Sequence, residues 1–329
     1  MLHGWIILDK PVGIGSTTAV SAVKRILREA GEPKTKVGHG GTLDPLASGV
    51  LPIALGEATK LCGRMLDATK AYEFTIAFGE ETDTLDAEGE IVGTSEVRPS
   101  LEQVEAILPR FIGVIEQVPP AYSAIKIGGK AAYARARAGE EVELEPRQVT
   151  VHDLDLLPAG EAGGEGNRSA HPNGGGAPPS ALRAAISPSL RDREEMDQIT
   201  LSATVSKGTY IRSLARDIAL ALNTVGHVTM LRRTKAGPFT LERAISLDFL
   251  RDAAKARALT RTVLPLEAGL DDIPGLPVTP EQAQLLRHGQ QLFGIPVSPG
   301  LHLAMDAETP VALVEATDGA ITVVRGFNL

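Results

Sequence analysis

The sequence predicts an α+β fold, in which strands and helices mix without a regular strand–helix–strand rhythm. Two observations favour this class. Large side chains alternate with small or polar ones in residues 72–78 and again in 201–205, as in strands with one buried face. Apolar side chains at helical spacing then follow in residues 211–222. We therefore expect a mixed central β-sheet flanked by helices.

The first 31 residues predict a strand, a turn and a helix. The apolar run 5–8 is typical of a buried strand, and it ends before Pro11. A glycine-rich turn follows, and Ser16 is a typical N-cap residue for a helix with one apolar face. Gly31 is a typical residue just beyond a helix end.

The middle of the chain predicts a helix at 101–111, a strand near 149–157 and then an insertion. Residues 158–198 are dominated by glycine, proline, serine and charged residues, and few of them could enter a core. We expect a flexible insertion inside one domain, between the strand near 149–157 and the strand at 201–205. A linker between two domains is the alternative.

A domain boundary is predicted in residues 264–277, which are rich in proline, glycine and aspartate. The following residues predict a helix at 280–288 and short alternating strands such as 301–305 and 320–324. We therefore expect a catalytic domain at 1–262 and a small barrel-like domain at 263–329.

Composition predicts a cytoplasmic protein without a metal. Of the 329 residues, 43% are hydrophobic and 22% charged, which is ordinary for a globular protein. No apolar run approaches the length of a membrane span, and the N-terminus lacks the features of a signal peptide. The single cysteine, Cys62, excludes a disulfide framework or a thiolate metal site, and the histidines show no metal-ligand spacing.

The net charge of −8 argues against a nucleic-acid partner, but the charge is unevenly distributed. Residues 24–36 hold five basic and two acidic side chains, and residues 207–235 hold six and one. Because phosphate binding depends on the local field, both segments are candidate RNA contacts. Solvated helix faces are the alternative. From residue 264 onward there are two basic and eight acidic residues, which argues against strong phosphate binding there.

The segment GHGGTLDPLASGVLP, residues 38–52, presents a solitary carboxylate on a stiff loop. Asp44 precedes Pro45, which favours an extended backbone, and three nearby glycines permit close approaches. Such a loop is a sensible way to hold a nucleophile. An aspartate that stabilises its own turn is the alternative.

Two further segments carry candidate chemistry. Residues 207–212, KGTYIR, lie where a strand ends and a helix begins, so Lys207, Arg212 and free backbone N–H groups form an anion site. The anion is either a phosphate or a carboxylate such as Asp44, which an arginine would keep ionised. Tyr72 shares its strand face with core side chains, yet at the strand end its ring could stack on a base and its hydroxyl could transfer a proton.

Taken together, these segments resemble a known family. The bacterial tRNA pseudouridine-55 synthases, the TruB family, are similar in GHGGTLDPLASGVLPIALGEATKL, KAYEFTIAFGEETDTLDAEGE, PPAYSAIKIGGKAAYARARAGE and SKGTYIRSLARDIA, in that order. The opening LDKPVGIGS and the later HVTMLRRTKAGPF match as well. The resemblance covers residues 4–250 without the insertion, and the tail resembles the family's PUA-type RNA-binding domain.

The resemblance implies isomerisation of uridine 55 in the T-loop of tRNA, by base flipping and without metal or cofactor. It implies that Asp44 is the catalytic aspartate, that Tyr72 stacks on the uracil and can remove the C5 proton, and that Arg212 pairs with the aspartate. The remaining matches are substrate-binding positions: His39 in the place of the extruded base, Tyr210 and Leu231 beside the flipped uracil, and Lys10 with Pro11 as an N-terminal support. Lys207 joins this set through the anion site.

The partner expected is therefore the T-stem-loop of tRNA, with no membrane and no obligatory protein partner, and the protein is expected to act as a monomer. Other classes remain to be weighed against it. A non-catalytic tRNA-binding protein that assists folding would not need the Asp44, Tyr72 and Arg212 set. A guide-RNA-dependent synthase would rely on partner proteins, and a nucleosidase would release free uracil.

Overall fold

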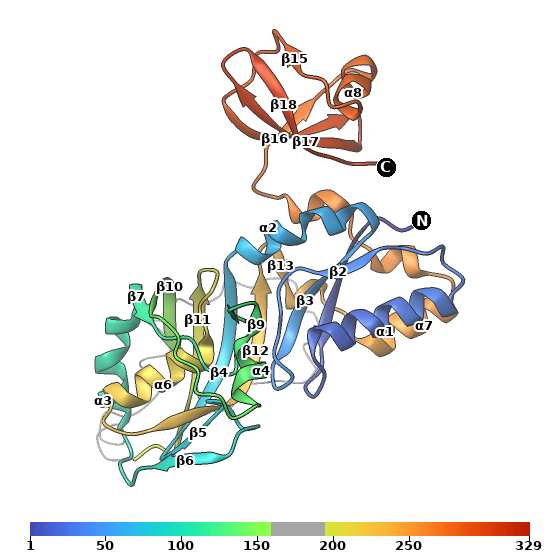
Figure 1. Cartoon of the computed structure of the whole chain (residues 1–329). Helices are drawn as coiled ribbons and strands as arrows, with labels where there is room; N and C mark the ends of the chain where they lie inside the picture. Colours follow the sequence, from blue (N-terminus) through green and yellow to red (C-terminus); the bar gives the residue numbers. More distant parts are fainter. Residues whose placement is uncertain (159–194) are drawn as a thin grey trace. The chain divides into compact units, whose positions relative to one another are not determined.

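The computed structural model describes residues 1–158 and 195–329 (Figure 1). The chain divides into two compact units, and each is described by itself: the first unit is Met1–Ala68 with Thr234–Leu329, and the second is Thr69–Arg233. Helices and strands alternate irregularly along both, which confirms the predicted α+β class. Across the described ranges, no helix combines the length and the apolar character needed to cross a bilayer.

Three antiparallel strands organise the N-terminal part of the first unit. β3 (Ser48–Leu55) pairs with both β1 (Gly4–Lys10) and β2 (Val37–His39), and β3 is buried along nearly its whole length. The predicted strand at 5–8 is therefore confirmed and is longer at both ends. Other elements of this part are η1 (Gly56–Leu61), α2 (Cys62–Asp67), β13 (Phe239–Thr240), η4 (Leu241–Arg243), α7 (Leu247–Lys255), η5 (Leu259–Thr262) and η6 (Leu266–Gly269).

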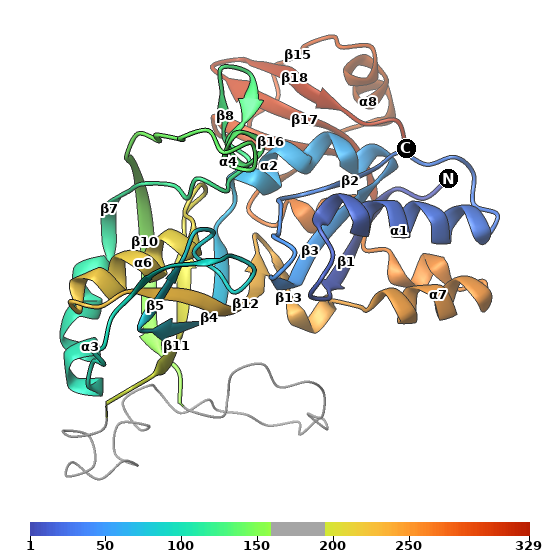
Figure 2. The ribbon, with the colours of Figure 1, turned by 60° about the horizontal axis from the view of Figure 1, so that its bottom comes forward.

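The core of the first unit is built around Trp5, which is fully buried. Its ring contacts Phe239 at 5.3 Å between centroids, and its Nε1 donates to the carbonyl of Leu266 at 3.0 Å. The indole thereby buries a large apolar surface without losing its hydrogen bond. Helices α1 (Ser16–Glu29) and α7 lie side by side (Figure 2).

The start of α1 differs from the expectation. Gly15 is the N-cap residue, with an extended backbone and no side-chain cap, and Ser16 is the first helical residue. The prediction that Ser16 caps the helix is therefore wrong, because its hydroxyl bonds to the backbone of Leu43 instead. The predicted helix end is confirmed: Gly31 has φ +78° and its N–H donates to the carbonyl of Arg28 at 3.0 Å.

The C-terminal part of the first unit is a curled five-stranded sheet with one helix. The order is β14-β16-β17-β18-β15, and the helix α8 packs against four of these strands, β15, β16, β17 and β18. A capping box between Thr279 and Gln282 begins α8, where the sequence predicts a helix. The sheet fits the predicted small barrel-like module; the boundary at residue 263 stays a prediction. The elements are β14 (Gly275–Pro277), α8 (Pro280–Arg287), β15 (Leu292–Phe293), β16 (Gly300–Asp306), β17 (Thr309–Thr317) and β18 (Ala320–Gly326).

The second unit is built on a sheet in the order β12-β4-β11-β10-β7, of which β12 continues into the first unit. β4 and β11 pair antiparallel and confirm the two alternating strands predicted from the sequence. The elements are β4 (Lys70–Phe78), β5 (Glu80–Thr82), β6 (Ile91–Thr94), α3 (Leu101–Ile107), η2 (Leu108–Phe111), β7 (Gly113–Gln117), β8 (Lys126–Ile127), β9 (Lys130–Ala131), α4 (Ala132–Ala136), β10 (Arg147–Leu156), β11 (Gln198–Val205), α6 (Ile211–Ala221) and β12 (Gly226–Ala236).

The predicted insertion 158–198 follows β10 and precedes most of β11, and these two strands pair antiparallel. Its residues 159–194 lie outside the described residues. At its far end, the backbone N–H of Met196 donates to Pro99 at 3.0 Å and the carbonyl of Asp197 accepts from Phe78 at 2.8 Å. The chain therefore re-enters the sheet in register with β4.

Candidate active site

The loop that carries Asp44 joins the two antiparallel strands β2 and β3 of the first unit. The N–H of Gly40 donates to Pro52 at 2.8 Å, which continues the strand ladder by one residue. A Cβ on Gly40 would lie 2.6 Å from the Cβ of Met65, so the close approach excludes any side chain. Gly41 has φ +119°, which side-chain-bearing residues rarely adopt. Two of the three glycines are thus required by the backbone path.

Lys10 supports the Asp44 loop through hydrogen bonds to backbone carbonyls. The side chain is fully buried, and its Nζ donates to the carbonyls of Pro11 at 2.9 Å, Ile14 at 2.7 Å and Pro45 at 3.4 Å. A buried ammonium is stable only when such acceptors replace its water. The carbonyl of Pro45 also accepts from the N–H of Gly13 at 2.9 Å. The residue that follows Asp44 is therefore held from two directions.

Ser16 fixes the residue that precedes Asp44. Its Oγ donates to the carbonyl of Leu43 at 3.0 Å and accepts from the N–H of Leu43 at 2.7 Å, in a buried environment. Asp44 itself is half-buried, and its carbonyl accepts from the N–H of Ala47 at 3.1 Å, which turns the chain toward β3. Because hydrogen bonds hold both Leu43 and Pro45, the backbone of Asp44 has little freedom to move.

His39 is the last residue of β2 and lies opposite Ile53 of β3. The residue is half-buried and one residue ahead of the glycine pair. His39 therefore stands at the junction between β2 and the Asp44 loop.

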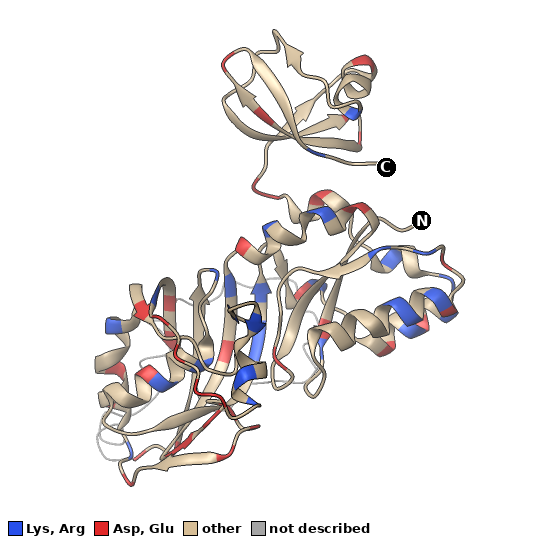
Figure 3. Ribbon diagram, in the orientation of Figure 1, with Lys and Arg blue, Asp and Glu red and all other residues tan. Residues whose placement is uncertain are grey.

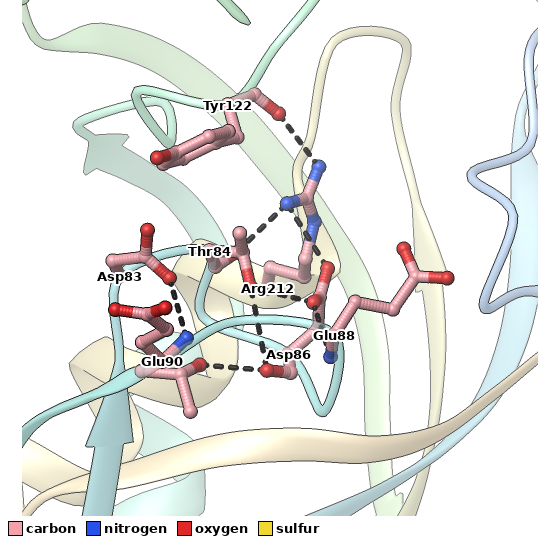
Figure 4. A network of polar contacts seen from close by, with 8 residues as sticks. Asp83, Thr84, Asp86, Glu88, Glu90, Tyr122 and Arg212 are labelled. Atoms are coloured by element: carbon pink, nitrogen blue, oxygen red, sulfur yellow. Dashed lines mark hydrogen bonds and ion pairs between the residues drawn. The ribbon is translucent and has the colours of Figure 1, made fainter. Parts of the chain in front are cut away.

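Arg212 lies in the first turn of α6 and is the centre of a polar cluster in the second unit (Figure 4). The residue is 5% exposed. Its Nη1 donates to the carbonyl of Thr84 at 2.8 Å, and its Nη2 donates to the carbonyl of Tyr122 at 2.9 Å. Nη1 also forms an ion pair with Asp86 at 3.2 Å.

Asp86 completes this cluster and was not singled out from the sequence. It is 3% exposed, and its Oδ1 accepts from the Thr84 hydroxyl at 2.6 Å and from the N–H of Glu88 at 3.0 Å (Figure 4). A buried carboxylate of this kind needs its lone pairs satisfied and a paired cation, and it has both. The sequence does not single it out, because the acidic loop 80–90 holds five other carboxylates.

Tyr122 and Asp83 lie beside the Arg212 cluster. The Asp83 carboxylate accepts a hydrogen bond from the Tyr122 hydroxyl, and this bond raises the pKa of Tyr122 above its ordinary value of 10.0. Asp83 also accepts from the N–H of Glu90 at 2.9 Å. The backbone carbonyl of Tyr122 thus accepts from Arg212, whereas its hydroxyl donates to Asp83 of the acidic loop.

The other predicted residues of the second unit lie on β4, on β12 and at or just before the start of α6. Tyr72 is half-buried on β4 opposite Ala203, at the end of the buried row formed by Phe74 and Ile76. Tyr210 is the N-cap residue of α6, Leu231 is 7% exposed on β12, and Lys207 is exposed in the turn before α6.

The two basic segments differ in burial. Lys24, Arg25 and Arg28 are all exposed on one face of α1 (Figure 3). In the segment 207–235, by contrast, Arg212 is 5% and Arg233 1% exposed. The segment 207–235 is therefore not simply a solvent-exposed charged surface, because two of its arginines are buried and one of them, Arg212, pairs with the buried Asp86.

The sequence-predicted residues divide between the units. Asp44, His39 and Lys10 belong to the first unit, and Tyr72, Tyr210, Arg212, Leu231 and Lys207 belong to the second. Within the first unit, the structure brings Lys10 to the Asp44 loop. Within the second, it brings Arg212 to Asp86. Among the residues that the structure describes, no group of three His, Cys, Asp or Glu side chains could hold a metal ion.

Comparisons with known proteins show the family of this chain. The family described as TruB family pseudouridylate synthase (N terminal domain) matches residues 24–165, and the tRNA pseudouridylate synthase B C-terminal domain matches residues 212–271. The chain belongs to the TruB family of pseudouridylate synthases. It is 57% identical to tRNA pseudouridine synthase B of Novosphingobium aromaticivorans, over 100% of this chain and 98% of that protein.

A second relative and a solved structure extend these comparisons. Identity to tRNA pseudouridine synthase B of Zymomonas mobilis is 54%, over 99% of this chain and 96% of the relative. The crystal structure of a Cbf5-Nop10-Gar1 complex contains a similar chain, with a TM-score of 0.68 and 26% identity over 99% of this chain and 85% of that one. The fold of the chain is thus shared with a chain of that complex.

Proposed function

We propose that this protein isomerises uridine 55 in the T-loop of tRNA to pseudouridine, with the carboxylate of Asp44 as the nucleophile. The observation that carries the proposal is the bracing of the Asp44 loop, in which Lys10 and Ser16 fix the residues on either side of the aspartate. A nucleophile must be held in a defined direction, and a turn-stabilising aspartate needs no such support. The family and its named relatives support the same reaction.

The chemistry balances with one carboxylate and one proton carrier. The Asp44 carboxylate forms a bond to C1′ of the ribose as the bond between C1′ and N1 of uracil breaks. The bond to Asp44 breaks in turn as a bond between C1′ and C5 forms, C5 loses a proton and N1 gains one. No atom enters or leaves and no electron is exchanged, so the reaction requires no redox cofactor. The base must first leave the stack, which costs a few kcal/mol.

The other residues take the roles that the family resemblance implies. Tyr72 stacks on the flipped uracil and removes the C5 proton, and Arg212 supplies the positive charge for the aspartate. His39 occupies the place of the extruded base, and Tyr210 and Leu231 form the pocket beside the uracil. Lys10 supports the Asp44 loop and Lys207 faces the phosphates. We assign residues 1–262 to catalysis and 263–329 to a PUA-like RNA-binding domain, acting on tRNA as a monomer in the cytoplasm.

The test is pseudouridine mapping on an unmodified tRNA transcript without added metal. Wild-type protein is compared with Asp44→Asn and with Asp318→Asn, an exposed turn residue that controls for handling. A second transcript with cytidine at position 55 controls for the site. We expect conversion at U55 by wild type and Asp318→Asn and none by Asp44→Asn. Conversion by Asp44→Asn would show that another carboxylate acts.

Two further outcomes address the other classes of protein. Tight tRNA binding without conversion by any variant would favour a non-catalytic tRNA-binding protein. Release of free uracil, measured by chromatography of the same reactions, would indicate a nucleosidase.

A further inference from the structure

Two side chains from neighbouring strand ends converge on Tyr210. Gln117 is the last residue of β7 and Arg147 is the first residue of β10, and the two are direct cross-strand partners. Directly opposed residues of an antiparallel pair project their side chains on the same face of the sheet. Both therefore reach the same neighbour, the turn that leads into α6.

Gln117 holds the backbone of Tyr210. The residue is 1% exposed; its Oε1 accepts from the N–H of Tyr210 at 2.8 Å, and its Nε2 donates to the carbonyl of Tyr210 at 3.1 Å. The side-chain amide of Gln117 offers a donor and an acceptor in one plane. It can therefore bond to the N–H and the carbonyl of Tyr210, as the backbone of a neighbouring strand would. A glutamate would keep only the acceptor, and a methionine would offer neither.

Arg147 holds the ring of Tyr210. Its Cζ lies 4.8 Å from the ring centroid, within the range of a cation–π contact. The guanidinium donates to the carbonyl of Gly208, and a Cβ on Gly208 would already lie 3.7 Å from Cζ. The Nε of Arg147 is buried with no hydrogen-bond partner among the described residues. The guanidinium of Arg147 thus contacts both the ring of Tyr210 and the turn at Gly208.

The position of Tyr210 also sets the position of Arg212. Tyr210 is the N-cap residue of α6, and Arg212 lies two residues further, in the first turn. The guanidinium of Arg212 makes its contacts with Thr84, Tyr122 and Asp86 from that turn. A shift of Tyr210 would therefore move Arg212 away from partners that are fixed elsewhere.

We propose that Gln117 and Arg147 are positioning residues for the pseudouridine synthase reaction, which hold the ring of Tyr210 and the start of α6 in the reactive arrangement. This inference rests on the proposed function, which places Tyr210 beside the flipped uracil. A preset aromatic ring lets a base stack without the entropic cost of ordering the ring. Misplacement by about 1 Å can lower a rate about 100-fold.

The test compares kcat and KM for tRNA in Arg147→Met, Arg147→Lys, Gln117→Met and Gln117→Glu. The matched controls are Gln148→Met, on the next and exposed position of β10, and Arg110→Met, an exposed arginine of η2. We expect kcat to fall about 10-fold to 100-fold in the four variants, with little change of KM for tRNA and no change in the controls. Arg147→Lys should not restore the rate, because a lysine keeps the charge but lacks the planar fork.

A second measurement follows Tyr210 without any RNA. The chain has four tyrosines, so ring-¹³C-tyrosine labelling gives a simple spectrum in which Tyr210→Phe identifies the Tyr210 signal. We expect Arg147→Met to shift that signal and to leave the Tyr72 signal in place. Arg147 is half-buried, so this variant keeps the test valid even where Gln117→Met fails to fold.

Three results separate the possible failures. Wild-type kcat in Arg147→Met, or an unshifted Tyr210 signal, would overturn the positioning role. A raised KM that Arg147→Lys restores would overturn it in favour of a direct contact between Arg147 and an RNA phosphate. Failure of the wild type to convert uridine would overturn the proposed function instead, and the spectrum would still report whether Arg147 fixes the ring.

Discussion

The Asp44 loop and the Arg212 cluster present charged groups of opposite sign, and they are stabilised in different ways. The Asp44 loop is held through its backbone: Lys10 and Ser16 bond to peptide groups of Pro45 and Leu43, 35 and 27 residues away in sequence. Arg212 is held through its side chain, by carbonyls 128 and 90 residues away and by the buried carboxylate of Asp86.

This difference predicts different sensitivities. A backbone-held loop should respond to changes of shape, because a new side chain displaces its path. A side-chain-held cation should respond to changes of charge, because a buried ion left without its partner is costly. Three substitutions test the contrast, in order of decreasing effect.

The largest effect is expected for Arg212→Met. The substitution leaves the carboxylate of Asp86 buried without its cation and removes two hydrogen bonds to carbonyls. Removal of one member of a buried pair costs about 3–5 kcal/mol in the free energy of unfolding. Urea denaturation measures this loss.

Two controls sharpen that measurement. Arg251→Met removes a partly exposed arginine paired with the exposed Asp248 on α7, and such a surface pair contributes about 0–1 kcal/mol. The double variant Arg212→Met/Asp86→Leu should recover part of the loss, since it leaves no unpaired charge. Equal losses for Arg212→Met and Arg251→Met would contradict a charge-held cluster.

A smaller effect is expected for Gly40→Ala in the Asp44 loop. The new Cβ would meet the Cβ of Met65 at 2.6 Å, and neither atom lies at the end of a flexible chain. Forced overpacking costs about 1–3 kcal/mol. Differential scanning calorimetry and the rate of uridine conversion would both report the shift of the loop.

Gly38→Ala is the matched control in the same segment. Its Cβ would lie 3.4 Å from the Sγ of Cys62, which is close to an ordinary contact, and Gly38 has no positive φ. We expect a change within about 0.5 kcal/mol. A large loss in Gly38→Ala, or none in Gly40→Ala, would mean that shape does not hold this loop.

The same contrast explains which parts could be predicted from the sequence. Alternation and helical spacing predict β4, β11 and α6, because those patterns repeat over neighbouring residues. The Asp44 loop is also recognisable, since its glycines and proline are contiguous. Asp86 and Gln117 were not found, because their roles depend on partners about 90 to 130 residues away, brought close only by folding. Ser16 was misassigned for the same reason: its tertiary partner Leu43 outcompetes the local cap.

The smallest effect concerns the pH response of the acidic loop beside Arg212. The hydrogen bond to Asp83 raises the pKa of Tyr122 above 10.0, so the neutral phenol is favoured in the folded protein. The stabilisation is fully present below pH 10 and is lost as the pH rises through the raised pKa of the folded state. The ring-¹³C signal of Tyr122, followed against pH, should have its midpoint above 10.0.

Asp83→Asn should move this midpoint back toward 10.0, because an amide accepts the phenol proton more weakly than a carboxylate does. Glu88→Gln is the matched control: it removes a neighbouring exposed carboxylate, and only the backbone N–H of Glu88 serves the cluster. An unchanged midpoint in Asp83→Asn would show that Asp83 does not raise the pKa of Tyr122. A midpoint that changes in Asp83→Asn and stays constant in Glu88→Gln would show that Tyr122 responds to the charge of its direct partner. Such a local response to charge is what we expect around a cation that is held through its side chain.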